Sequence, residues 1–228
     1  MVSYREVVTS RSATYPSANV YEELAESWYH LRHFTRFHRQ LITLGDRWRR
    51  GRLLNIGCGH GPDFLPFAEG AFDLFGIDSS REMLRYGQKY AAKFRFSAVL
   101  VLGDAVRLPF DDNTFDHAIA IAIYHHIKDE NCRLQAYREL HRVLKSGGEA
   151  FITVWNLRRS SPFSKSGEVM VPWMVRGKAV YRYVYVYRPT ELRRELMKSG
   201  FRVLSQQPRV SFLAPFYRNI AFLVAKRS

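Results

Sequence analysis

The sequence predicts an α/β protein whose core is a doubly wound, mostly parallel sheet of the Rossmann-like type, with helices on both faces. Two observations lead to this prediction. Short apolar runs alternate with helical patterns between residues 53 and 155, and such alternation is typical of parallel strands joined by helical crossovers. The first apolar run, Leu53–Gly57, leads directly into the alternate glycines Gly57, Gly59 and Gly61. Glycine turns of this kind connect the first strand of such a sheet to the following helix.

The N-terminal residues 1–50 are predicted to form a helical cap in front of the first strand. Residues 1–17 show little periodicity, whereas apolar side chains between Val20 and Leu44 recur at helical spacing. Within this pattern three arginines, Arg32, Arg36 and Arg39, are separated by four and then three positions. We therefore expect them to share one face of a helix.

The remaining elements are predicted from their apolar runs and their boundaries. The predicted strands are Leu53–Gly57, Leu74–Asp78, Ala98–Asp104, Ala118–Ile123, Ala150–Trp155, Phe201–Gln206 and Ile220–Ala225, with an antiparallel strand at the C-terminus. Helices are predicted after Gly61, over Met83–Ala92 and Asn131–Leu144, and from Pro189 to Gly200. Residues 156–188 interrupt the alternation, and we expect them to form an insertion over the mouth of the site. The length of 228 residues predicts one domain, residues 1–228.

Acidic residues at the ends of the apolar runs indicate a nucleoside cofactor site. Asp78 ends the second run, about 20 residues after the glycines, where an acid can accept both ribose hydroxyls. Glycines let the backbone approach a ligand closely, and a helix N-terminus offers free N–H groups to an anion. Asp104 ends the third run, and Asp116 precedes the fourth. Each acid alone is ordinary at a strand end, but the ordered set favours a cofactor site.

Composition limits the classes of partner. The net charge is +14, and an Arg-rich chain suits nucleic acid better than a small neutral substrate, because guanidinium groups bind phosphates and stack on bases. No apolar run reaches the ~18 residues of a membrane span, and no secretory signal is expected at the N-terminus. Two cysteines, Cys58 and Cys132, form neither a disulfide framework nor a metal-binding set. A cytoplasmic protein without a metal site is therefore expected.

The GxGxG spacing resembles class I S-adenosylmethionine (SAM)-dependent methyltransferases rather than NAD enzymes. The resemblance implies SAM as cofactor and Asp104 as the acceptor for the adenine amino group. The cofactor-binding residues that it implies are Asn55, Gly57, Gly59, Gly61, Asp78, Asp104, Ala105 and Ile121.

Three further segments resemble the eukaryotic tRNA methyltransferases that esterify the carboxymethyl group at C5 of the wobble uridine, position 34. These segments are Val20–Ala25 followed by Arg32, Ala118–His126, and Val154-Trp155 with Val171–Trp173. The resemblance implies the tRNA anticodon loop as substrate and Arg32, His125 and His126 as catalytic residues, with Arg32 clamping the carboxylate. A carboxylate is ionised at pH 7, so its attack needs no general base. The substrate-binding residues that it implies are Tyr21, Arg36, Trp155, Trp173 and Arg176.

Some of these roles have structural alternatives. We expect only one residue of the histidine pair to touch substrate, and Arg32 can instead be an exposed helix residue paired with Glu22 or Glu26. The aromatic residues Trp155, Trp173, Tyr185 and Tyr187 can stack on bases or simply pack, and Trp173 is the better stacking candidate.

The resemblance also implies a partner. Eukaryotic members of the family work with a small zinc-binding activator protein, and the run Phe96–Leu102 is expected to be a long apolar sheet edge to which it adds.

Two other functions compete with tRNA methylation. A small-molecule methyltransferase of the quinone-biosynthesis type would share the cofactor motifs and Leu108-Pro109-Phe110, but it would not explain the double histidine or the basic charge. A non-catalytic SAM- and RNA-binding module is disfavoured because Asp78 and Asp104 are both present.

Overall fold

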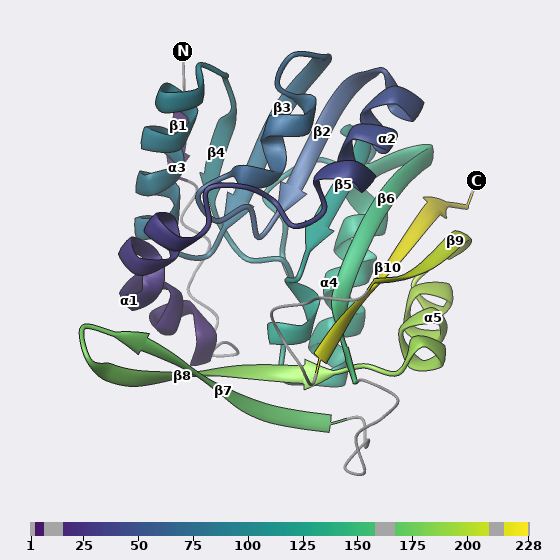
Figure 1. Ribbon diagram of the computed structural model, residues 1–228. Coiled ribbons are helices and arrows are strands. Elements are labelled where there is room, and N and C mark those ends of the chain that lie inside the picture. The colour runs from purple at the N-terminus through teal and green to yellow at the C-terminus, as the bar shows by residue number, and fades with distance from the viewer. Residues whose placement is uncertain (1–2, 7–15, 158–166, 210–216, 228) are drawn as a thin grey trace.

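The computed structural model describes residues 3–6, 16–157, 167–209 and 217–227. Their centre is an eight-stranded sheet in the order β1-β4-β3-β2-β5-β6-β10-β9 (Figure 1). β10 runs antiparallel to both of its neighbours, whereas the pairs from β1 to β6 are parallel. The strands are β1 Ser3–Glu6, β2 Arg50–Ile56, β3 Ala71–Asp78, β4 Val99–Leu102, β5 Phe115–Ile121, β6 Leu144–Leu157, β9 Phe201–Arg209 and β10 Tyr217–Lys226. The predicted Rossmann-like sheet with one antiparallel C-terminal strand is confirmed.

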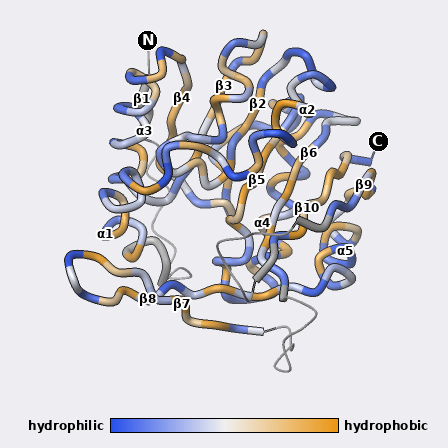
Figure 2. Tube along the Cα trace, in the orientation of Figure 1, coloured by the Kyte–Doolittle hydropathy of each residue, from blue (hydrophilic) through white to orange (hydrophobic). Residues whose placement is uncertain are grey.

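Helices cover both faces of this sheet and create two apolar cores. The helices are α1 Pro16–Leu31, α2 His38–Trp48, α3 Arg81–Phe94, α4 Glu130–Val143 and α5 Pro189–Lys198, with 3-10 turns η1 Pro62–Phe67 and η2 Tyr124–His126. One core joins the apolar faces of α4 and α5 to the sheet, and the other joins those of α2, α3 and η1 to the opposite face. Hydrophobic residues follow the central strands (Figure 2). No helix among the described residues is long and apolar enough to cross a bilayer.

The N-terminal cap differs from its prediction, because the expected helix is broken between α1 and α2. Side chains take the carbonyl groups that a continuous helix would use: His60 Nε2 donates to the carbonyl of Arg32 at 2.6 Å, and the Tyr90 hydroxyl donates to that of His33. Arg32 and Arg36 therefore lie in the connection between the helices, while Arg39 is exposed on α2. The three arginines do not share a helix face.

The helix predicted after Gly61 is also shorter than expected. It is only the 3-10 turn η1, which contains Pro66, and a proline inside a helix removes a hydrogen-bond donor and disfavours continuation.

The predicted insertion contains a β-hairpin that lies apart from the main sheet. Its strands, β7 Gly167–Val175 and β8 Lys178–Val186, pair only with each other as a two-stranded sheet among the described residues. The hairpin crosses below the carboxyl ends of the parallel strands and reaches α1 (Figure 1). Residues 158–166 of the insertion lie outside the described part of the chain.

The expectation of an open edge at Phe96–Leu102 is wrong. β1 pairs in parallel with β4 along Ser3–Glu6, with Tyr4 opposite Leu100. The hydrogen-bonding groups on that side of β4 therefore already face a strand of the same chain, and β1 forms the edge of the sheet.

Candidate active site

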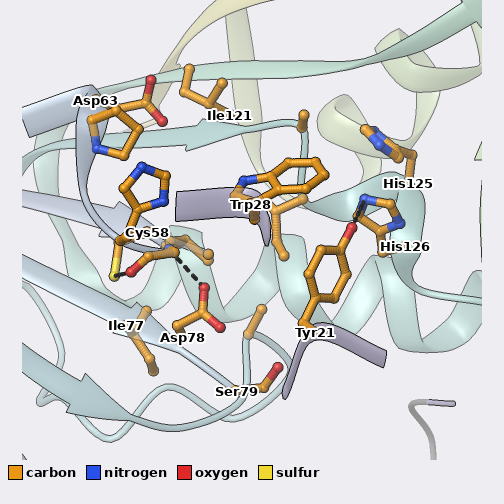
Figure 3. Close-up of a pocket in the computed structure, with 18 of the residues that line it drawn as sticks. Tyr21, Trp28, Cys58, Asp63, Ile77, Asp78, Ser79, Ile121, His125 and His126 are labelled. Atoms are coloured by element: carbon orange, nitrogen blue, oxygen red, sulfur yellow. Dashed lines mark hydrogen bonds between the residues drawn. The ribbon is translucent and has the colours of Figure 1, made fainter. Parts of the chain in front are cut away.

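A cavity at the carboxyl ends of β2, β3, β4 and β5 brings most of the predicted site residues together. It is closed by α1, by the α1–α2 connection and by β8. The predicted residues that line it are Tyr21, Arg32, Arg36, Gly57, Gly59, Asp78, Asp104, Ala105, Ile121, His125, His126 and Trp155. Asp78 and Cys58 lie on one side and the histidines on the other, with Trp28 between them (Figure 3).

The glycine turn has a backbone that other residues would strain. Gly57 and Gly59 have φ values of +67° and +53°, and the N–H groups of Gly57 and Cys58 both donate to the carbonyl of Ile77, at 2.8 and 3.0 Å. A Cβ at position 57 would lie 2.6 Å from Ile123 Cδ1. The position requires glycine because of its positive φ and its tight packing.

Asp78 both holds this turn and faces the cavity. Its Oδ2 accepts from the N–H of Gly59 at 2.8 Å, and its Oδ1 accepts from the N–H of Ser80 at 2.9 Å. Burial raises the pKa of Asp78 to about 6. Each carboxylate oxygen has a further lone pair that can accept a ligand hydroxyl.

Asp104 and Ala105 line the same part of the cavity, but two other predicted cofactor residues do not. Gly61 lies behind the turn, as the N-cap of η1. Asn55 is fully buried in β2, and neither polar atom of its side chain has a partner among the described residues. The structure therefore leaves these two residues outside the cavity lining.

The histidine pair occupies η2, at the carboxyl end of β5, and its two members differ. His126 uses both ring nitrogens: Nδ1 is 2.8 Å from the carbonyl of Tyr183, and Nε2 is 2.8 Å from the Tyr21 hydroxyl (Figure 3). Burial lowers the pKa of His126 to about 4, so the ring is neutral at pH 7. Because a carbonyl only accepts, Nδ1 carries the hydrogen and the Tyr21 hydroxyl donates to Nε2.

His125 is fully buried and uses one ring nitrogen in hydrogen bonds with the described residues. Its Nδ1 accepts from the backbone N–H of Trp155 at 3.3 Å. Burial, reinforced by His126 and Arg182, holds the pKa of His125 well below its usual value. The neutral ring therefore carries its hydrogen on Nε2, which has no partner among the described residues. His125 is thus set up as a hydrogen-bond donor and not as a base.

Two arginine side chains that line the cavity lie against the Trp28 ring. The Arg32 guanidinium lies 4.0 Å from the centre of the Trp28 ring, and that of Arg182 lies 5.3 Å from it. Burial and the nearby charges of Arg36 and Arg182 lower the pKa of Arg32 to about 10, so it remains charged at pH 7.

The alternative role of Arg32 as an exposed, paired helix residue does not apply. Glu22 instead accepts from the N–H groups of Arg81 and Glu82 at 2.8 and 2.9 Å, at the start of α3. Glu26 pairs with Arg176 at 2.8 Å.

The insertion contributes differently from its prediction. Trp173 and Arg176 do not line the cavity. The indole of Trp173 packs on Trp28, with ring centres 4.8 Å apart, and its Nε1 donates to Ser27 Oγ at 3.1 Å. Trp173 is therefore a packing residue between the hairpin and α1 and not a free stacking surface. Of the alternating tyrosines Tyr181, Tyr183, Tyr185 and Tyr187, only Tyr181 is largely exposed, at 54%.

Sequence reasoning missed several lining residues, chiefly Trp28, Asp63 and Arg182. A signal for Arg182 was present, because it is the one charged residue inside the aromatic and apolar run 179–186 of β8. Trp28 looked like one more apolar position of a helix, so its place in the cavity could not be distinguished from core packing.

Comparison with known proteins agrees with this architecture. The family profile described as methyltransferase domain matches residues 53–148. A methyltransferase-family protein of Encephalitozoon cuniculi is 31% identical over 163 residues, which cover 68% of this chain and 72% of that protein. The tRNA (carboxymethyluridine(34)-5-O)-methyltransferase of Schizosaccharomyces pombe is 39% identical over 145 residues, covering 61% of this chain and 58% of that enzyme.

Other methyltransferases are also similar. The demethylmenaquinone methyltransferase of Renibacterium salmoninarum is 31% identical over 136 residues, covering 54% of each chain. The match therefore spans little more than half the length of this relative and of the S. pombe enzyme. A SAM-dependent methyltransferase from Methanosarcina mazei has the same fold, with a TM-score of 0.69 at 20% identity over 78% of this chain and 93% of that one. Together, the sheet order, the glycine turn and these matches show that the chain belongs to the SAM-dependent methyltransferases.

Proposed function

We propose that this enzyme methylates the carboxylate of a carboxymethyl group at C5 of the tRNA wobble uridine, position 34. The observation that carries the proposal is a set of donors in one cavity: the guanidinium of Arg32 and the Nε2–H of a neutral His125, which has no partner among the described residues. An ionised carboxylate only accepts hydrogen bonds, and Arg is the side chain best suited to clamp it. The name of the S. pombe relative supports the same substrate.

The residues near the glycine turn fit SAM. Gly57 and Gly59 allow close approach of a ligand, Asp78 has lone pairs for ribose hydroxyls, and Asp104 lines the adjacent wall. When bound, SAM supplies a methyl group to a carboxylate oxygen and leaves as S-adenosylhomocysteine. The chain's own task is positioning, because the nucleophile is already ionised. The neutral histidines agree with this, since neither presents a nitrogen lone pair that is free to remove a proton.

In this proposal Arg32 neutralises the carboxylate, and His125 orients it with one hydrogen bond. Arg32 supplies the positive charge, and its contact with Trp28 fixes the guanidinium beside the cavity. His125 supplies one directed N–H from η2. His126 positions Tyr21 through their hydrogen bond and so shapes the wall without a free donor of its own.

Features around the cavity support tRNA as the substrate. The chain has a net charge of +14, and Arg36 lies on the same α1–α2 connection as Phe34, which lines the cavity and is 67% exposed. An exposed aromatic beside arginines suits an unstacked anticodon base. The second candidate, a small-molecule methyltransferase, is favoured by the match with the R. salmoninarum enzyme. The guanidinium groups of Arg32 and Arg182 in the cavity argue against an apolar quinone substrate, because such a substrate would offer them no anionic partner.

Variants of His125 test the proposed chemistry. His125→Gln retains an N–H near the position of Nε2, whereas His125→Met removes it. A hydrogen bond to a charged acceptor contributes about 1.5–3 kcal/mol. We therefore expect His125→Met to lower kcat/KM for tRNA bearing the acid about 10- to 100-fold, and His125→Gln to retain most activity. Equal activity of His125→Met and the unmodified enzyme would contradict the assignment of His125 as donor.

The zinc-binding activator remains a proposal, and the structure changes how it must be tested. A partner strand could pair with β4 only by replacing β1. Leu100 is buried, at 2% exposure, so charged substitutions there would disrupt the core instead of reporting on the partner. Deletion of residues 1–6 is the cleaner change. If the activator uses this edge, the shortened chain should bind it more tightly in gel filtration than the full chain, and equal binding would place the activator elsewhere.

We also propose a cytoplasmic location. Cys58 and Cys132 are both free thiols, which is typical of proteins in a reducing compartment.

A further inference from the structure

Arg182, in β8, is a buried arginine without a carboxylate partner in the described part of the chain. Arg182 is only 4% exposed and lines the cavity. It forms no ion pair with any described residue, and its Nε has no hydrogen-bond partner among them. Removing a charge from water without pairing it costs several kcal/mol. An unpaired buried charge therefore does not stabilise the fold, and its presence suggests that an anionic ligand pairs with it.

Arg133 shows how this chain pairs a buried arginine elsewhere. Arg133 is 3% exposed, lies 3.5 Å from a carboxylate oxygen of Glu195 and donates to the carbonyl of Lys128 at 2.9 Å. Arg182 has the same burial and no equivalent of Glu195. Burial alone therefore does not explain its unpaired charge.

Aromatic side chains from two elements hold Arg182 in place. Its guanidinium lies 5.3 Å from the ring centre of Trp28 on α1 and 5.1 Å from that of Trp173 on β7. It also lies near Tyr21, whose hydroxyl donates to His126. Contacts with ring faces stabilise a cation only partly, so they orient the guanidinium without neutralising it.

Three basic residues lie near Arg182. Its charge contributes to the lowered pKa values of Arg32, His125 and His126. Arg32 lies on the same indole, at 4.0 Å from Trp28. Two guanidinium groups held against one tryptophan, beside the free N–H of His125, form a site that attracts an anion.

We propose that Arg182 is a substrate-specificity residue that binds the substrate carboxylate together with Arg32. This inference rests on the proposed function. It makes the β7–β8 hairpin part of the active site, since one guanidinium follows α1 and the other comes from β8. The same pair explains how substrate and product are distinguished. Methylation converts the carboxylate to an uncharged ester, so the attraction to both arginines is lost and the product is released.

The test compares binding of an acid and of its neutral amide. The probe is a synthetic anticodon stem-loop with 5-carboxymethyluridine or 5-carbamoylmethyluridine at the wobble position, titrated with S-adenosylhomocysteine present and followed by tryptophan fluorescence. We expect the unmodified enzyme to bind the acid at least 10-fold more tightly than the amide. Arg182→Gln should bring the two affinities within about 3-fold of each other, and Arg182→Lys should give an intermediate ratio. The matched control is Arg176→Gln, at the exposed hairpin turn outside the cavity, which should keep the full preference.

The outcomes separate this inference from the proposed function. If the unmodified enzyme prefers the acid and Arg182→Gln keeps that preference, the role of Arg182 is wrong and the proposed function stands. If the unmodified enzyme has no preference for the acid, both are wrong. Thermal melting of the ligand-free protein gives a second readout. Because the charge is unpaired, Arg182→Gln should melt at the same or a higher temperature, and a large decrease would show that Arg182 serves the fold instead.

Discussion

Replacing Asp78 with asparagine tests the link between the glycine turn and cofactor binding. The two carboxylate oxygens accept from different backbone N–H groups, those of Gly59 and Ser80, at 2.8 and 2.9 Å. Asparagine has one acceptor oxygen, so one of these N–H groups would face an amide NH2. An unsatisfied buried donor costs about 1–3 kcal/mol, and loss of a charged acceptor for a ribose hydroxyl costs about 1.5–3 kcal/mol. We expect the loss of the charged acceptor to weaken binding of S-adenosylhomocysteine about 10- to 150-fold, since about 1.4 kcal/mol is tenfold, while the unsatisfied donor lowers the stability of the turn.

The pH dependence of cofactor affinity tests the role of Asp78 a second time. Burial raises the pKa of Asp78 to about 6 in the ligand-free protein, whereas the ribose hydroxyls bind the ionised form. The affinity of the unmodified enzyme should therefore fall as the pH is lowered from 7.5 to 5.5. The effect on folding has the opposite sign. Because the folded pKa lies above the ordinary 3.8, this carboxyl stabilises the ligand-free fold at low pH, and that contribution is lost as the pH rises through about 6.

Isothermal titration calorimetry with S-adenosylhomocysteine at pH 7.5 and pH 5.5 measures how the substitution and the pH each change the affinity. Asp63→Asn is the matched control: burial raises the pKa of Asp63 to about 6 as well, and it lines the cavity without bonding to the glycine turn. This control should keep its affinity within about 3-fold at pH 7.5, with a dependence on pH that still comes from Asp78. Binding by Asp78→Asn within 3-fold of the unmodified enzyme would show that the Asp78 carboxylate does not hold the cofactor.

Two further predictions concern packing. Gly57→Ala should lower both the melting temperature and the affinity for S-adenosylhomocysteine, because the positive φ costs about 1–2 kcal/mol for alanine and the new Cβ would lie 2.6 Å from an isoleucine methyl carbon. The control Gly147→Ala has a φ of +73° and no atom within 4 Å of the new Cβ, so it should lower only the melting temperature. Equal cofactor binding by the two variants would contradict this prediction. Arg133→Met should reduce the free energy of unfolding, measured in urea, by about 3–5 kcal/mol, because it leaves the buried Glu195 without its arginine. Arg176→Met removes an exposed ion pair and should reduce it by at most about 1 kcal/mol. Similar decreases in the two variants would show that the buried ion pair contributes nothing extra to stability.

Local patterns in the sequence predicted the parts of the site that lie close together along the chain. Gly57, Gly59 and Asp78 follow from strand ends and a fixed spacing, and the structure joins Gly59 to Asp78 by a hydrogen bond. The histidine pair lies at a strand end for the same reason. These predictions needed only the rule that ligands bind at the carboxyl ends of parallel strands.

Predictions that depended on contacts between distant segments were less successful. Arg32 and Arg36 do line the cavity, but through a break in the helix that is stabilised by His60 and Tyr90 from elsewhere in the chain. No helical periodicity reports such a break. Arg182 and Trp28 meet only because the hairpin packs on α1. Long-range packing of this kind has no local signature.

The sheet edge shows the same limit. β1 covers only Ser3–Glu6, a polar segment without alternation. It pairs with β4 through the row of backbone groups that β4 presents at the sheet edge.

The central claim is that the methyl group enters a carboxylate on tRNA. The most direct measurement transfers labelled methyl from SAM into tRNA that bears the acid form of the wobble modification, followed by mild alkali, with and without the activator. We expect label in the tRNA and its release by alkali as methanol, which is diagnostic of a methyl ester. Label that remains on the tRNA after alkali would place the methyl on nitrogen, carbon or ribose. Absence of label with cofactor bound and activator present would contradict a tRNA substrate.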